Sequence, residues 1–149
     1  MKLKLHAFSG ALALLTISTF WTSTVVSEVS GNKDMIIWVK TAVLYGMFVL
    51  IPAMATAGAT GAMLGKGWRL PQVAAKQRRM KIIAANGLLI LLPSAVFLAL
   101  RAQSHQFDTA FYLVQGVELL AGATNITLLI RNMKDGLALR GRRLKRTAA

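Results

Sequence analysis

Four long apolar segments, separated by short polar stretches, constrain this chain more than any other feature of its sequence. They cover residues 7–26, 41–64, 82–100 and 110–130. A helix needs about 20 mostly apolar residues to cross the roughly 30 Å hydrocarbon core of a bilayer. Within that core only helices and closed barrels satisfy the backbone, and these segments lack the alternation of barrel strands. The sequence therefore predicts an all-α membrane protein with four transmembrane helices.

The connections between these segments are short, which favours an up-down antiparallel bundle with both termini on the same side. We expect a single transmembrane domain over residues 1–149, with loops at 27–40 and 101–109 on the side away from the termini. Residues 131–149 form a basic tail after the fourth helix. The pair Asp135-Gly136 predicts that the fourth helix ends there.

Basic residues are distributed unevenly between the two sides of this topology. The chain has 18 Lys and Arg against 5 Asp and Glu, a formal net charge of +13. Fifteen of the 18 fall on the side of the termini, and only Lys33, Lys40 and Arg101 fall on the other. Cytoplasmic loops carry an excess of Lys and Arg, so we expect both termini to be cytoplasmic. Topology thus explains the charge without a nucleic-acid partner, and it predicts contact with anionic lipid at the cytoplasmic face.

The fourth segment carries the polar residues that most need an explanation. Gln115, Glu118 and Asn125 share one face at the helical period. An ionisable group inside a membrane span is rare, and it usually faces the bundle interior or a cavity. We predict an intramembrane polar site around Glu118, either a structural hydrogen-bonded knot between helices or a functional site.

Lys40, at the start of the second segment, is the candidate cation for Glu118. The alternative is an interfacial lysine beside Trp38 whose ammonium reaches the lipid headgroups. The sequence favours the interfacial alternative and leaves the ion pair open.

Small residues line one face of the second segment, among them Gly46, Ala53, Ala57 and Gly61. Small residues let two helices approach closely. They predict either packing within the bundle or the interface of a homo-oligomer, and three partner helices in the same chain favour packing within it.

His6 is the candidate ligand for a haem b iron, with a methionine or a second subunit as the other axial ligand. Facing histidine pairs, which bis-histidine cytochromes show, are absent from the sequence. The chain has no cysteine, which excludes disulfides and thiolate metal sites. No metal site and no catalytic residue is predicted.

Several stretches resemble a group of small, uncharacterised four-helix inner-membrane proteins of bacteria. They are His6, FWTST at 20–24, YGMFVLIPAMA at 45–55, NGLL at 86–89, FDTAFY at 107–112 and QGVELLAG at 115–122. The resemblance spans nearly the whole chain. It implies a bacterial inner-membrane protein and carries no activity with it.

These observations rank three functions. The first is a binding or transport module, or an accessory subunit of a larger complex or homo-oligomer, built around Glu118. The second is an electron-transfer protein that holds haem b or a quinone through His6. The third is an enzyme that uses Glu118 as a general acid or base, and it ranks last because no second carboxylate or Ser–His pair accompanies Glu118.

Overall fold

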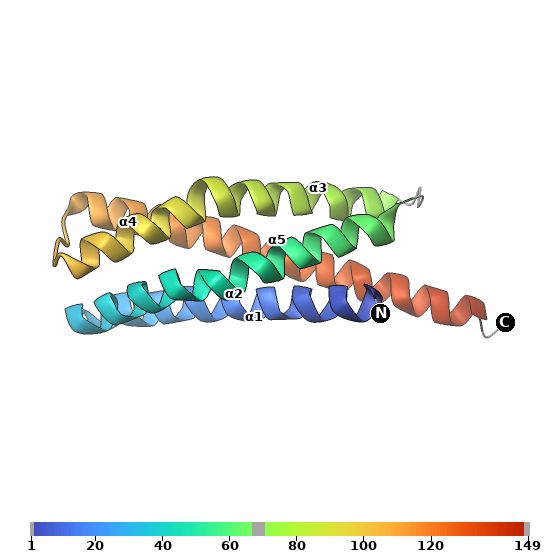
Figure 1. Cartoon of the computed structure of the whole chain (residues 1–149), viewed down its shortest axis with the longest axis horizontal. Helices are drawn as coiled ribbons and strands as arrows, with labels where there is room; N and C mark the ends of the chain where they lie inside the picture. Colours follow the sequence, from blue (N-terminus) through green and yellow to red (C-terminus); the bar gives the residue numbers. More distant parts are fainter. Residues whose placement is uncertain (1, 67–70, 148–149) are drawn as a thin grey trace.

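The computed structural model describes residues 2–66 and 71–147, with side chains described as far as residue 138. Every regular element in these ranges is helical (Figure 1). The elements are α1 (Lys2–Ser30), α2 (Lys33–Gly65), α3 (Pro71–Asn86), the π-helical turn η1 (Gly87–Leu91), α4 (Leu92–Gln103) and α5 (Thr109–Thr147).

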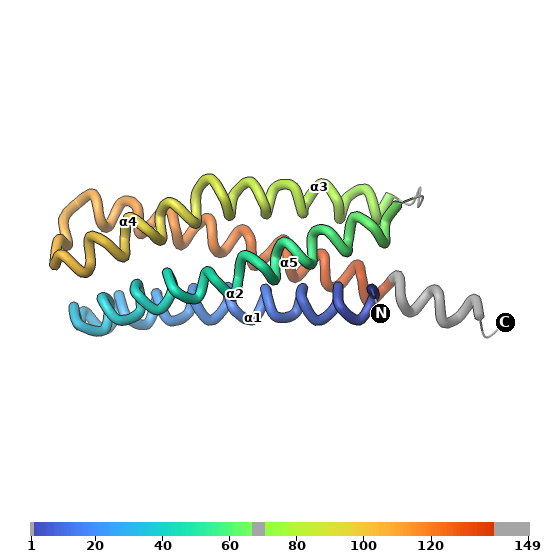
Figure 2. Tube along the Cα trace, in the orientation of Figure 1, coloured from blue at the N-terminus to red at the C-terminus, as the bar shows by residue number. Residues whose placement is uncertain are grey.

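Four rods lie side by side in an up-down bundle. The elements α3, η1 and α4 follow one another without a break, so they form one rod (Figure 2). All four rods are long and apolar enough to cross a membrane. Contacts join α1 to α2, α2 to α4, α4 to α5 and α5 back to α1, which closes the bundle. The predicted fold class is therefore confirmed.

The two ends of the bundle differ in what they hold, and we call them the loop end and the terminal end. The loop end holds the turn Gly31–Asn32 and the loop 104–108 (Figure 1). The terminal end holds the starts of α1 and α3 and the long extension of α5.

The loop expected at residues 27–40 is a turn of two residues. Gly31 takes a φ of +64°, a conformation that glycine adopts without steric cost. The side chain of Asn32 caps α2 by accepting a hydrogen bond from the N–H of Met35 at 3.1 Å. Both helices consequently extend beyond the predicted spans. Glu28 belongs to α1 and Lys40 to α2, and neither lies in a loop.

The predicted end of the fourth helix at Asp135-Gly136 is also wrong, because α5 continues to Thr147. At the predicted end, α5 contacts α3. Arg79 of α3 donates hydrogen bonds to Asn132 at 2.9 Å and to Asp135 at 2.7 Å. Gly136 lies against the ammonium of Lys76, so this part of α5 is packed on α3.

The small-residue face of α2 packs within the bundle. A Cβ atom at Gly46 would collide with the ring of Phe20, and one at Gly61 would lie 3.0 Å from the ring of His6. Ala53 and Ala57 are both buried. The first of the two alternatives, packing within the chain, is therefore the one that the structure shows.

Candidate functional site: a buried ion pair

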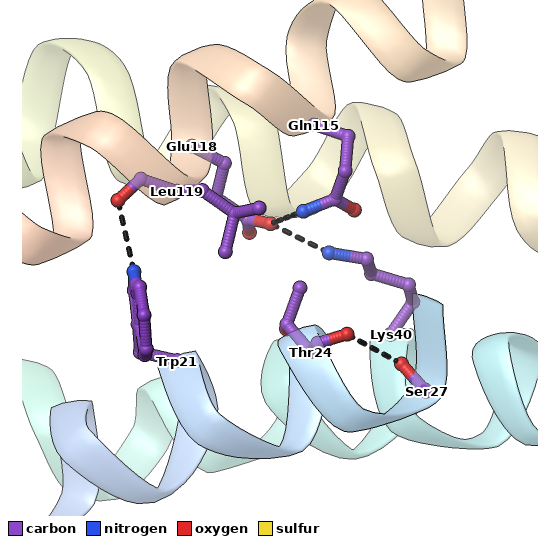
Figure 3. Close-up of polar contacts among 7 residues, drawn as sticks. All are labelled: Trp21, Thr24, Ser27, Lys40, Gln115, Glu118 and Leu119. Carbon is purple, nitrogen blue, oxygen red and sulfur yellow. Dashed lines mark hydrogen bonds and ion pairs between the residues drawn. The ribbon is translucent and has the colours of Figure 1, made fainter. Parts of the chain in front are cut away.

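Lys40 and Glu118 form an ion pair between α2 and α5, with 2.6 Å between Nζ and Oε2 (Figure 3). Lys40 is 1% exposed and Glu118 is 9% exposed. The interfacial alternative for Lys40, which the sequence favoured, is wrong. Because the hairpin of α1 and α2 is tight, Lys40 lies two helical turns inside α2, and its side chain points into the bundle.

Gln115 completes this centre from the preceding turn of α5. Its Nε2 donates a hydrogen bond to Oε2 of Glu118 at 3.2 Å, the oxygen that also accepts from Lys40. Among the described residues, Oε1 of Gln115 is buried and has no donor. Oε2 of Glu118 thus accepts from two donors, while the amide oxygen of Gln115 is left without a partner.

Glu28, at the loop end of α1, is an acid that the sequence pattern did not single out. It lies in the last turn of α1 and is partly buried. Its Oε1 is buried without a hydrogen bond in the part of the chain that the structure describes. A turn at Gly31–Asn32, with Asn as the cap of α2, is the sequence signal that would have placed Glu28 on a helix.

A small cavity of about 30 Å³ adjoins the ion pair. Glu118, Thr24 and Trp21 are among its lining residues, and Trp21 donates a hydrogen bond from Nε1 to the carbonyl of Leu119 at 2.9 Å (Figure 3). Met47 and Leu50 add apolar atoms to its lining. A volume of this size holds about one water molecule.

Asn125 does not join the ion pair. It lies about 10 Å further along α5 than Glu118, since each residue rises 1.5 Å. Its Oδ1 accepts a hydrogen bond from Asn86 at 2.8 Å, and its Nδ2 donates to the carbonyl of Ile83 at 3.3 Å. Asn86, which also donates to the carbonyl of Ala121, thus connects α3 with α5 as a separate polar contact.

His6 lies away from the ion pair, near the terminal end. Its Nδ1 is 3.0 Å from the carbonyl of Ala57 and 3.2 Å from the hydroxyl of Thr60, and its Nε2 is 3.3 Å from the ammonium of Lys76. Both ring nitrogens already have protein partners. An iron on either nitrogen would have to displace one of them, so these contacts give the haem alternative no support.

The described residues contain no group of three His, Asp or Glu side chains that could hold a metal ion. The chain matches no protein-family model, and no curated protein or solved structure is significantly similar to it. Its own side chains are therefore the guide to its chemistry. The centre brings an ammonium, a carboxylate and an unpartnered amide oxygen together inside the bundle.

Proposed function

We propose that the chain is a small polytopic inner-membrane protein that acts as a binding or transport module, or as an accessory subunit of a larger membrane complex. Its functional centre is the ion pair of Lys40 and Glu118 together with Gln115. The membrane location rests on the four apolar rods and on the resemblance to small bacterial inner-membrane proteins.

One observation supports this proposal above the others: a lysine and a glutamate are buried together inside the bundle as an ion pair. Removing two charges from water costs several kcal/mol per ion, and their attraction often does no more than offset that cost. Apolar side chains of similar volume would stabilise the bundle as well or better. Ionisable residues retained within membrane spans are for this reason functional candidates.

The orientation follows from the charges at the terminal end. Lys2, Lys4 and the bases of α3 and α5 lie there, so by the positive-inside rule this end faces the cytoplasm. The ion pair then lies in the outer half of the membrane, close to the loop end. Anionic lipid headgroups are the partners that the basic cytoplasmic face attracts.

Four helices leave little room for a pore within one copy, so a transporter of this size would act as a homo-oligomer or within a larger assembly. The buried side of α2 is packed against α1, α3 and α4 of the same chain, so contacts with another copy or a partner would use other faces.

The experiment is the purification of tagged wild-type protein and of Glu118→Gln from native membranes, with identification of everything that co-purifies. The control is Asp135→Asn, which removes a carboxylate from the half-exposed pair with Arg79. We expect a lipid, small molecule or subunit to be retained by wild type and by the control, and lost from Glu118→Gln. A folded Glu118→Gln protein that keeps every component would overturn the proposal.

A further inference from the structure

His6 of α1 is a titratable side chain that the proposed function does not use, and it contacts two other helices at the terminal end. Its Nδ1 lies 3.0 Å from the carbonyl of Ala57 in α2, and its Nε2 lies 3.3 Å from the ammonium of Lys76 in α3. The carbonyl can only accept, so Nδ1 carries the proton of the neutral ring. The ammonium can only donate, so Nε2 is the acceptor. The neutral ring therefore suits both partners.

The ammonium of Lys76 lies between α1 and α5. On one side it contacts His6, and on the other a Cβ atom at Gly136 would lie 3.3 Å from it. Glycine at this position leaves room for the ammonium. The described backbones of α1 and α3 do not contact each other, so the side chains of His6 and Lys76 bridge the two helices.

No acid compensates a second positive charge at this contact. From α2, His6 faces the uncharged groups of Ala57 and Thr60. Asp135 is the one acid at the terminal end among the described residues, and it pairs with Arg79 at 2.7 Å. The other bases of this end whose side chains are described are exposed, namely Lys2, Lys4, Lys66, Arg78, Lys81, Arg131 and Lys134.

Protonation of His6 reverses the match at Nε2. Both nitrogens of the imidazolium are donors, so an N–H would face the ammonium of Lys76. Two positive charges would then lie 3.3 Å apart and repel each other. Arg79, one turn later in α3, stays bonded to Asn132 and Asp135 of α5, so the repulsion acts on the start of α3.

We propose that His6 and Lys76 form a pH-sensitive latch that joins α1 to the start of α3. With His6 neutral the latch is closed. In the opening step a hydronium ion gives its proton to Nε2 and leaves as water, and the ammonium of Lys76 moves away together with the first turn of α3. The latch lies apart from the ion pair of Lys40 and Glu118, so this inference goes beyond the proposed function and does not depend on it.

The test is the distance between two spin labels, measured by pulsed electron paramagnetic resonance on the full chain in lipid nanodiscs. The chain has no cysteine, so the labels attach at Leu5→Cys in α1 and Ala74→Cys in α3, both exposed positions. We expect the distance to lengthen reversibly between pH 7.5 and pH 5.5. In this range an ordinary histidine titrates, while ordinary Asp and Glu stay ionised.

Two variants in the labelled chain assign the change to the latch. His6→Gln does not titrate and Lys76→Met has no ammonium to repel, so each should keep one distance at both pH values. Two matched controls should retain the change. His105→Gln removes the other histidine of the chain, and Lys81→Met removes an exposed base of α3.

Wild type decides the test if a variant does not fold. A wild-type distance that is the same at both pH values would overturn the inference. So would a change that survives in folded His6→Gln or Lys76→Met, because the two side chains would then not act together. A change that is lost in folded His105→Gln would overturn it as well, since the histidine of the loop end would then be the sensor.

Discussion

At the scale of single residues, Lys40 and Glu118 compensate each other's charge inside the bundle. Either residue alone would leave an uncompensated charge in the bundle. Removing one partner of a buried pair costs about 3–5 kcal/mol, whereas replacing both by apolar residues is often neutral or stabilising. The pair is therefore a poor source of stability and a candidate source of function.

We predict that Lys40→Met and Glu118→Leu each lower the free energy of unfolding by about 3–5 kcal/mol. The double variant Lys40→Met/Glu118→Leu should unfold within about 1 kcal/mol of wild type, because no charge is left without a partner. Reversible unfolding in detergent micelles measures all four proteins. Additive losses in the double variant would show that the two charges do not act as a pair.

Which polar residues form the site could be predicted from the sequence only in part. The helical period correctly placed Gln115 and Glu118 together inside the bundle. The same period placed Asn125 on that face, but a shared face does not mean a shared site when the residues differ by seven positions. Whether Lys40 pairs or reaches the headgroups depended on the length of the turn before α2, which hydropathy does not encode.

At the scale of elements, the start of α5 depends on one carboxylate. Asp108 accepts a hydrogen bond from the N–H of Phe111 at 2.9 Å and pairs with Arg101 at 2.8 Å. That N–H, and secondarily the guanidinium of Arg101, hold the pKa of Asp108 below its ordinary value. Asp108 therefore caps the helix in its charged form.

We predict that this cap makes the stability of the bundle depend on pH in the acid range. The pKa is lower in the folded chain, so the contribution is complete above the unfolded value of about 3.9 and is lost as the pH falls through the folded value. Thermal unfolding between pH 3 and 7 measures it. Asp108→Asn keeps an acceptor oxygen but does not titrate, so its melting temperature should fall less over that window; equal falls would contradict the prediction.

The packing of α1 on α2 gives a second prediction at this scale. Gly46→Ala puts a methyl group into the ring of Phe20, and overpacking of this kind costs about 1–3 kcal/mol. Gly10→Ala is the matched control, since a Cβ atom there meets no other atom within 4 Å. Unfolding in detergent compares them. The smaller side chain in Gly46→Ala/Phe20→Leu should restore stability, and the absence of any rescue would contradict the assigned contact.

The elements themselves were largely predictable, and their ends were not. Apolar length identifies four rods, because the bilayer requires that length of every spanning helix. The boundaries go with particular contacts: Asn32 is the cap of α2, and Arg79 joins α3 to α5 at Asp135, where the sequence predicted an end. A cap depends on one local turn, and a contact between two helices joins residues distant in the sequence. A hydropathy pattern reveals neither.

At the scale of the whole molecule, the account predicts an orientation. The chain has no cysteine, so a cysteine introduced at one position is the only thiol in the protein that a maleimide can label. In intact cells a membrane-impermeant maleimide should label Gln106→Cys at the loop end, and Lys2→Cys only after the cells are permeabilised. Gln106 and Lys2 are both exposed, which makes the pair a matched comparison. The reverse pattern would place the ion pair in the cytoplasmic half of the membrane.

The central claim is that the buried pair of Lys40 and Glu118 serves binding and contributes little to stability. The most direct measurement is the set of molecules that co-purify from native membranes with wild type and with Lys40→Met/Glu118→Leu. The account predicts that the double variant is as stable as wild type and lacks a lipid, small molecule or subunit that wild type retains. A double variant of unchanged stability that retains the full set would contradict it.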